Sequence, residues 1–390
     1  MIGRHPFRLL LNRRAGPPGM VVLPEAGFQR ARAAITSWEG YAPTPLLPLP
    51  DVAAASRVAA VHWKDEAPRF GLGSFKALGG AYAVLRVLQA ELARKGVAPE
   101  ASAAELAEGK YREATRAVTV TCATDGNHGR SVAWGAQRFG CRCVIFVHPG
   151  VSAGRREAIA RFGAEVREVP GTYDDAVRAA NTTAEREGWR VVSDSSWPGY
   201  TEVPRDVMQG YRLMAEEAAA SLDQPPTHVF VQGGVGGLAA AIAVQLRARY
   251  GAAAPRLIVV EPDAAACLLA SAEAGVPVAL PGPLGTIMAG LECGEPSLLA
   301  WAELERAAFA FMAVPDAAAI AAMRVLARRQ PKLEAGESAV AGLAALLLAA
   351  AEPFARGALD LTPDSRVLLF GTEGATDPVL WRQLVEAPAG

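Results

Sequence analysis

The sequence has little net charge and few cysteines. Its 39 basic and 40 acidic residues leave a formal net charge of −1, so it shows no electrostatic footprint for a nucleic acid or a membrane surface. The five cysteines are odd in number and scattered, which argues against a disulfide framework and suits a reducing compartment. A zinc site would need more ligands near Cys141 and Cys143, and none stand there. We therefore expect no metal and no nucleic-acid partner.

Long hydrophobic runs are also lacking. The longest, residues 339–351, is too short to span a bilayer, which takes about 20 residues. Residues 1–14 carry two basic patches around a short apolar piece and do not make a signal peptide. We expect a soluble cytoplasmic protein without a membrane partner. No repeat of fixed period is present either.

The 390 residues, half of them hydrophobic, are enough for a large core and two domains. The proline-rich residues up to about 50 predict an arm and an entry loop, and a strand is expected at 61–64. Strands at 118–122, 143–148, 165–169 and 189–193 then alternate with helices at 129–139, 153–162 and 173–186. Thr172 and Asp175 stand in capping-box positions before the last of these helices. Such alternation is typical of βαβ units and a parallel sheet.

Beyond the polar loop 194–204, the pattern resumes. It predicts helices at 205–220, at 238–250 and over most of 317–351, and strands at 228–232, 257–261 and 366–370. The predicted fold is α/β with two domains, each an open, mostly parallel twisted sheet flanked by helices. We expect 1–80 and 200–390 to form the large domain and 81–199 the small one.

Lys76 stands among apolar and glycine neighbours in residues 70–82. Ser74 is placed to cap a helix whose inner stripe is Leu78, Tyr82, Leu85, Leu88 and Leu92. Lys76 would then lie in the first turn, poorly solvated. Burial lowers the pKa of a lysine, and the neutral amine can attack a carbonyl, as a Schiff-base lysine must. Most lysines taken singly lie on the surface and reach water, so this prediction depends on the motifs that follow.

A glycine turn at residues 233–237 follows an apolar strand and opens a helix. Gly233, Gly234, Val235, Gly236 and Gly237 would offer free backbone N–H groups to a phosphate. Two cofactors fit this turn. Gly234, Gly236 and Ala239 match a dinucleotide fingerprint, with Glu261 as the ribose-binding acid, which would make the protein an NAD-dependent oxidoreductase. Pyridoxal phosphate needs one phosphate cradle and one lysine, and it also gives Lys76 a role.

A polar loop at residues 124–129 follows the strand that ends at Cys122. The carboxyl end of a parallel strand is where ligands bind in open α/β sheets. Asn127 can donate to a ring oxygen, and Asp125 can act as a base or bind an ammonium. Asp-Gly is also a common turn pair, so the loop alone would be read as turn chemistry. His128 fits a packed or supporting histidine better than a catalyst.

Together these motifs resemble the fold type II pyridoxal phosphate enzymes, which include threonine dehydratase, cysteine synthase and the tryptophan synthase β subunit. The chain shares with them Ser-Phe-Lys, Gly-Asn-His and the glycine turn in this order. Within the family it is most similar to the ammonia-lyases of 2,3-diaminopropionate. That likeness covers about residues 42–378 and rests on segments starting at Arg69 (RFGL), Thr124 (TDGNHGR), Asp194, Trp197 (WPGYT), Met208 (MQGY), Thr286 (TIMAGLECGEP) and Gly371 (GTEGATDP).

The resemblance implies a role for each site residue. Lys76 would hold pyridoxal 5'-phosphate covalently and act as the base for an L-substrate. For the cofactor it implies Asn127 at the ring hydroxyl, residues 233–237 at the phosphate and Thr372 at the ring nitrogen. For the substrate it implies Asp125 as the base for the D-isomer, Asp194 at the distal ammonium, and Thr124 and Tyr173 lining the pocket. It further implies a homodimer acting on a small amino acid.

The expected reaction converts D- or L-2,3-diaminopropionate to pyruvate and ammonia by α,β-elimination. A threonine or serine dehydratase would share every other feature of the site but would not need Asp125 and Asp194. Dehydratases of this family usually have a small residue at the position of Asp125. An NAD-dependent dehydrogenase would use the glycine turn differently, and a non-catalytic binding protein would not need Lys76. Bound cofactor and its fixation to Lys76 by borohydride would separate the pyridoxal phosphate enzymes from the dehydrogenase and the binding protein. The substrate that releases ammonia would then separate the ammonia-lyase from the dehydratases.

Overall fold

The computed structural model describes residues 5–386, and they fold into two compact units. The first unit comprises residues 5–23, 43–74 and 214–386. The second comprises residues 24–42 and 75–213. The domain boundaries expected from the sequence, 1–80 with 200–390 and 81–199, stay a prediction. The predicted fold class, an α/β protein with two mostly parallel sheets flanked by helices, is confirmed.

The first unit contains a seven-stranded sheet in the order β1-β10-β9-β8-β11-β3-β2. The two edge strands, β1 and β2, run antiparallel to their neighbours, and the five strands between them are parallel. The central strands are buried on both faces, which explains their continuous apolar runs. The strand bounds are β1 (Arg8–Leu11), β2 (Leu46–Pro48), β3 (Ala60–Asp65), β8 (His228–Gln232), β9 (Arg256–Pro262), β10 (Ala310–Val314) and β11 (Arg366–Gly371).

Helix α14 (Ala341–Ala351) forms the centre of the first unit's core. It is apolar all round and buried from Ala341 to Ala350, as expected of a helix enclosed by other elements. Gly342 lets it approach the sheet, because a Cβ there would lie 2.6 Å from the Phe230 carbonyl oxygen. The other helices of this unit are α2 (Pro50–Ser56), η1 (Arg69–Gly71), α10 (Gly237–Tyr250), η2 (Gly251–Ala253), η3 (Asp263–Ala265), α11 (Cys267–Ala274), η4 (Ala289–Leu291), α12 (Leu298–Ala307), α13 (Asp316–Ala327), α15 (Pro353–Ala358) and α16 (Pro378–Glu386).

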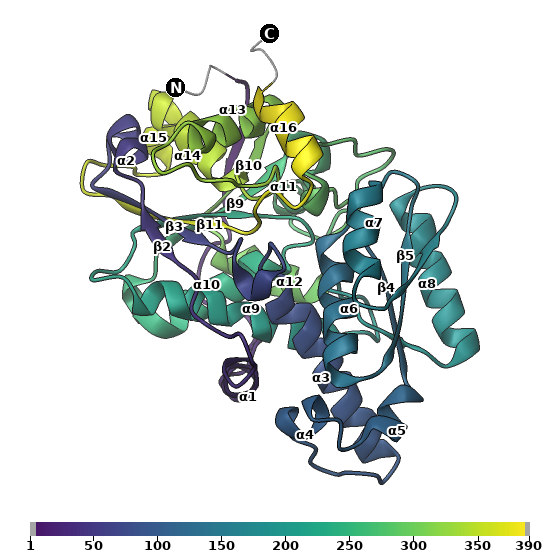
Figure 1. Cartoon of the computed structure of the whole chain (residues 1–390). Helices are drawn as coiled ribbons and strands as arrows, with labels where there is room; N and C mark the ends of the chain where they lie inside the picture. The colour runs from purple at the N-terminus through teal and green to yellow at the C-terminus, as the bar shows by residue number, and fades with distance from the viewer. Residues whose placement is uncertain (1–4, 387–390) are drawn as a thin grey trace. The chain divides into compact units, whose positions relative to one another are not determined.

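The second unit contains a parallel four-stranded sheet in the order β6-β5-β4-β7. Its strands are β4 (Thr119–Ala123), β5 (Arg142–Val147), β6 (Glu165–Glu168) and β7 (Arg190–Val191). Helices α6 and α8 pack on β4 and β5, and α3 packs on α6 (Figure 1). The helix bounds are α1 (Glu25–Thr36), α3 (Ala77–Arg94), α4 (Ala103–Ala107), α5 (Arg112–Arg116), α6 (Asn127–Phe139), α7 (Ala153–Ala160), α8 (Tyr173–Glu187) and α9 (Glu202–Ala220), of which residues 214–220 belong to the first unit.

Most elements expected from periodicity are present, and the capping box of α8 is confirmed in both directions between Thr172 and Asp175. Two expectations are wrong. Residues up to 50 are not only an arm and a loop, since they include β1, α1 and β2. Ser74 does not cap α3, which begins at Ala77 without a side-chain cap; Ser74 is buried and forms an isolated β-bridge with Glu373.

Helix α1 escaped the sequence pattern because its buried side has few large apolar side chains. Only Gly27, Phe28, Ala31 and Ile35 are buried, and two of these are small. Across residues 5–386, no helix combines the length and the apolar character that crossing a membrane requires.

Candidate functional site

Three strands of the second unit end at the same edge of its sheet, and each is followed by an ionisable side chain. Asp125 follows β4, His148 follows β5, and Asp194 follows β7. The strands are parallel neighbours, with Ala123 opposite Phe146 and Thr121 opposite Val191. Their carboxyl ends therefore gather these groups where open α/β sheets bind ligands.

Lys76 pairs with Asp194 within the second unit. The Lys76 Nζ lies 2.6 Å from Asp194 Oδ2, and each side chain is 19% exposed. The same ammonium lies 5.3 Å from the centroid of the Phe75 ring and 5.6 Å from that of Tyr211. The predicted lysine and the predicted ammonium-binding acid are thus in direct contact, in an environment that is partly apolar.

The electrostatic environment of Asp194 keeps its carboxylate ionised. Burial by itself disfavours the charged form, but the Lys76 ammonium more than offsets this, so the pKa of Asp194 is lowered. His128 Nε2 lies 2.7 Å from the Val192 carbonyl oxygen and must donate to it, since a carbonyl only accepts. Its Nδ1 is buried, has no hydrogen-bond partner, and lies 3.7 Å from Asp194 Oδ2. Burial lowers the pKa of His128, so Nδ1 is a spare acceptor beside the Asp194 carboxylate.

Asp125 contacts His148, a residue that sequence reasoning did not select. The His148 Nε2 lies 2.9 Å from Asp125 Oδ1, and the two side chains are 23% and 25% exposed. The sequence did contain a signal for His148, because His148 ends the strand predicted at residues 143–148, just as Asp125 follows the strand predicted at residues 118–122. Strand order, which shows the two strands to be neighbours, comes only from the tertiary structure.

The loop from Thr124 to Asn127 leads into α6. The buried Thr124 hydroxyl oxygen accepts from the N–H groups of Gly126 and Gly129, at 3.0 Å each, and so shapes the start of the helix. Gly126, the residue before the helix, has φ +151° and offers no side-chain cap. Asn127 is the first helical residue and is half-buried. The roles of Thr124 and Asn127 toward a ligand stay predictions.

Tyr173 is the first residue of α8 and follows the edge strand β6. It is half-buried, and the capping box of Thr172 and Asp175 fixes the turn on which it stands. Its predicted contact with a substrate stays a prediction.

The glycine turn lies in the first unit, between β8 and α10. Gly233 N–H donates to Val260, and the first intrahelical bond runs from Ala240 to the Gly236 carbonyl. The N–H groups of the first helical turn have no partner within the helix, and Gly236, with φ +94°, offers no side-chain cap. A Cβ on Gly234 would also lie 3.1 Å from Cys293 Sγ and 3.3 Å from the Gly290 oxygen. Backbone donors that the helix leaves unpaired, at the start of a 14-residue helix preceded by glycine, fit a phosphate group.

Thr372 follows β11, and its residue is 4% exposed. On the neighbouring strand β8, the last residue is Gln232, which donates its amide to the carbonyls of Ala339 and Phe370. The amide oxygen of Gln232 is buried without a partner, directly before the glycine turn. A neutral hydroxyl at position 372 suits a pyridine nitrogen, and this role stays a prediction.

The RFGL segment is anchored by a buried charge network in the first unit. The Arg69 guanidinium binds Glu66 at 2.9 Å and Glu217 at 2.7 Å, and Lys64 binds the same Glu217 oxygen at 2.6 Å. These two acids raise the pKa of Arg69 despite its burial. The network holds Phe70 in the left-handed region, at φ +50°. It therefore fixes the loop that leads to Ser74.

Glu261, the acid required by the dinucleotide interpretation, is not available to a ribose. It is 0% exposed and accepts from the N–H groups of Leu268 and Leu269 at 2.7 and 2.8 Å. It thus satisfies the free donors at the start of α11. The NAD interpretation is not supported by this geometry.

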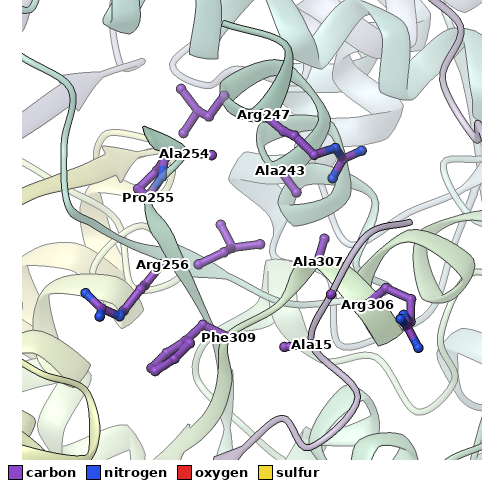
Figure 2. A pocket seen from close by; sticks show the side chains of 12 residues that line it. Ala15, Ala243, Arg247, Ala254, Pro255, Arg256, Arg306, Ala307 and Phe309 are labelled. Atoms are coloured by element: carbon purple, nitrogen blue, oxygen red, sulfur yellow. The ribbon is translucent and has the colours of Figure 1, made fainter. Parts of the chain in front are cut away.

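A cavity of about 240 Å³ lies elsewhere in the first unit, lined by residues of α10, β9 and α12 (Figure 2). Its arginines, Arg247, Arg256 and Arg306, point in different directions, and the first two already pair with Glu303 and Asp360. A ligand site needs polar groups that converge, so this cavity is not a candidate. Within the described range, no group of three or more His, Cys, Asp or Glu side chains is placed to hold a metal ion.

Comparison with known proteins gives consistent matches. The family described as pyridoxal-phosphate dependent enzyme matches residues 38–369. The diaminopropionate ammonia-lyase of Escherichia coli (strain K12) is 39% identical over 355 residues, which cover 89% of this chain and 88% of that protein. An L-threonine dehydratase of Salmonella typhimurium is 32% identical over 169 residues, which cover 43% of this chain and 31% of that protein.

The solved structures include a similar protein in a reacting state. It is the diaminopropionate ammonia-lyase of Escherichia coli in complex with an aminoacrylate-PLP azomethine reaction intermediate. The likeness has a TM-score of 0.88 at 36% identity and covers 97% of each chain.

Proposed function

Because the chain belongs to the pyridoxal-phosphate dependent enzyme family, with the type II fold, we propose that it eliminates both amines of 2,3-diaminopropionate. The substrate, as the D- or L-isomer, and one water would give pyruvate and two molecules of ammonia. The resemblance inferred from the motifs is confirmed by a relative that matches 89% of the chain. The threonine dehydratase match covers less than half of the chain.

The pair between Lys76 and Asp194 is the observation that carries the substrate assignment. Asp194 holds an ammonium at 2.6 Å, and the spare acceptor His128 Nδ1 lies 3.7 Å from the same carboxylate oxygen. Once the Lys76 amine is engaged elsewhere, these two acceptors are left for another ammonium. Diaminopropionate carries a second amine that serine and threonine lack, so it is the substrate that uses them.

The residues that would hold pyridoxal 5'-phosphate are the ones that the family motifs assign. Lys76 supplies the amine for the covalent link, Asn127 the bond to the ring hydroxyl, and Thr372 the partner of the ring nitrogen. Residues 233–237 supply the free donors for the phosphate. When bound, the cofactor withdraws electrons from the substrate's α-carbon, which makes the α-hydrogen acidic.

Two bases would remove the α-hydrogen from opposite sides. Lys76 acts on the L-isomer and Asp125 on the D-isomer. The departing β-amine must be protonated to leave, and an acidic environment supports this. Asp125 and Asp194, at the ends of neighbouring strands, supply that field. Thr124 and Tyr173 would line the substrate pocket.

Borohydride fixation tests the covalent role of Lys76. We expect the purified wild-type protein to absorb visible light as a yellow holoenzyme, and reduction should fix the cofactor to a single peptide containing Lys76. The Lys76→Ala variant should lose this labelling and nearly all turnover, because no other amine replaces it. A labelled peptide from elsewhere in the chain, or a colourless wild type, would overturn the assignment.

Ammonia yield separates the proposed lyase from a dehydratase of the same fold. Diaminopropionate should release two ammonia molecules per pyruvate, whereas serine would release one per pyruvate and threonine one per 2-oxobutyrate. We expect diaminopropionate to have the higher kcat/KM. If serine or threonine is turned over faster, the alternative holds instead.

The Asp125→Asn variant tests the stereochemical assignment. The amide cannot accept the α-hydrogen, so kcat for the D-isomer should fall roughly 10²- to 10⁴-fold, the contribution typical of a general base. The L-isomer should be affected far less, because Lys76 serves it. Equal losses for the two isomers would contradict the role of Asp125.

We also propose a homodimer in the cytoplasm. Closed two-fold symmetry is the commonest arrangement of homo-oligomers, and the five cysteines, all among the described residues, form no disulfide, which suits a reducing compartment. Sedimentation equilibrium of the holoenzyme should give about twice the 40.8 kDa chain mass.

A further inference from the structure

We propose that His148 is a positioning residue that orients Asp125 and thereby controls turnover of the D-isomer. This inference rests on the proposed function, because it takes Asp125 to be the base for that isomer. His148 does not act on the substrate itself. It acts through the hydrogen bond between its Nε2–H and Asp125 Oδ1.

The fold brings the two residues together through neighbouring strands. Asp125 stands two positions after β4, and His148 directly follows β5. These strands are parallel and in register up to Ala123 and Phe146. Pro149 restricts His148 to extended backbone, so the imidazole is presented at the strand end rather than in a helical turn.

The backbone after His148 selects the protonation state of its ring. The Gly150 N–H lies 3.2 Å from Nδ1 and donates to it, so Nδ1 carries a lone pair. In the neutral ring the proton is therefore on Nε2, which faces Asp125 at 2.9 Å. Gly150 also accommodates the ring closely, since a Cβ there would lie 2.6 Å from His148 Cε1. The ring is thus held on both sides, in the tautomer that donates to the acid.

This arrangement prepares Asp125 for use as a base. A donor on Oδ1 fixes the rotation of the carboxylate, so the group is held in one orientation toward the substrate. The other oxygen, Oδ2, has no hydrogen-bond partner among the described residues and is left for a substrate. The second unit's other histidine, His128, is buried and donates its Nε2–H to a main-chain carbonyl instead. Another charged side chain, Arg155, approaches the loop at Gly126 through its aliphatic part.

Two variants of His148 separate orientation from general structural support. His148→Ala removes the donor, whereas the amide of His148→Gln can place an N–H where Nε2–H was. We expect the D-to-L ratio of kcat/KM to fall roughly 10- to 100-fold in His148→Ala, the factor that a hydrogen bond to a charged group is worth. We expect most of this ratio to return in His148→Gln. The inference would be overturned if His148→Ala lowered kcat/KM equally for both isomers or left the D-to-L ratio unchanged. It would also be overturned if His148→Gln did not restore the ratio.

A spectroscopic measurement tests the pair without using turnover. The chain has five histidines, so ¹⁵N-histidine labelling of the holoenzyme, with single-site variants for assignment, isolates the His148 signals. We expect the Nε2–H tautomer in the wild type and a shifted Nε2 resonance in Asp125→Asn. The inference would be overturned by any other tautomer in the wild type, or by a His148 Nε2 resonance that is the same in the wild type and in Asp125→Asn. If diaminopropionate is not a substrate but the tautomer is as expected, the proposed function fails while the His148–Asp125 contact stands.

Discussion

Glu261 lies outside the proposed site, and its ionisation should make the stability of the protein depend on pH. Its carboxyl is fully buried, and burial raises its pKa to about 8, although the N–H groups of Leu268 and Leu269 oppose this. The ordinary pKa of a glutamate is about 4.3, so the folded protein retains a proton that the unfolded chain releases between these pH values. The free energy of unfolding should therefore fall as the pH rises from about 4.3 to 8.

The Glu261→Gln variant tests this dependence. Glutamine keeps the shape and one acceptor but does not titrate. We expect the wild type to lose a few kcal/mol relative to the variant between pH 5 and pH 8, since one pKa unit corresponds to about 1.4 kcal/mol. Urea denaturation at the two pH values measures this difference. The exposed Glu108→Gln variant is the control and should follow the wild type, whereas a Glu261→Gln curve parallel to the wild type would contradict the prediction.

The MQGY segment, residues 208–211, lies in helix α9, and the contacts of that helix explain its glycine and its flanking residues. A Cβ on Gly210 would lie 1.8 Å from the carbonyl oxygen of Leu78, so only glycine allows α9 to approach the start of α3. The preceding Gln209 donates to the carbonyl of Pro24 at 2.9 Å, and the Tyr211 ring lies 4.7 Å from that of Phe75. The segment therefore packs against the first residues of α3, which directly follow Lys76.

Paired glycine substitutions test this close approach. Gly210→Ala should destabilise the protein by at least 1–3 kcal/mol, roughly the cost of overpacking a close contact. Gly154→Ala, in α7, meets nothing within 4 Å and should be neutral or stabilise by up to about 1 kcal/mol through helix propensity. Thermal and urea unfolding of the two variants measure the contrast. Similar stabilities for both would mean that α9 and α3 can separate at little cost.

The cofactor should contribute to the stability of the whole molecule. A ligand that binds only the folded chain stabilises it by mass action, by about 2.7 kcal/mol at 100 times its dissociation constant. Removing pyridoxal phosphate should therefore lower the Tm, and adding it back should raise the Tm with the logarithm of the cofactor concentration once the site is nearly saturated. Differential scanning calorimetry of holoenzyme, cofactor-free and reconstituted protein measures this.

The Lys76→Ala variant is the matched control for cofactor removal. It keeps the glycine turn but lacks the amine, so added pyridoxal phosphate should raise its Tm less than that of the wild type. Equal stabilisation of both proteins would show that the covalent link contributes nothing to holding the cofactor.

The sequence alone was enough for the fold class and for most of its regular elements. The alternation of short β-rich runs with helical segments predicts parallel sheets, because each element must bury one face. Strand β8 was expected at the residues where it lies, and α8 with the capping box it shows. The Ser-Phe-Lys, Gly-Asn-His and glycine-turn motifs also identified the family. Each motif is a short continuous segment, so both its residues and its order along the chain can be recognised from the sequence.

Contacts between distant segments were decided by the tertiary structure. Edge strand β1 pairs with β10, which lies far along the chain, and α1 has too few large apolar residues to show a periodic pattern. Ser74 turned out to form a bridge rather than a cap. The pairs Lys76–Asp194 and Asp125–His148 join residues 118 and 23 positions apart. Which strand ends are neighbours depends on strand order, and strand order is a property of the assembled sheet, not of any one segment.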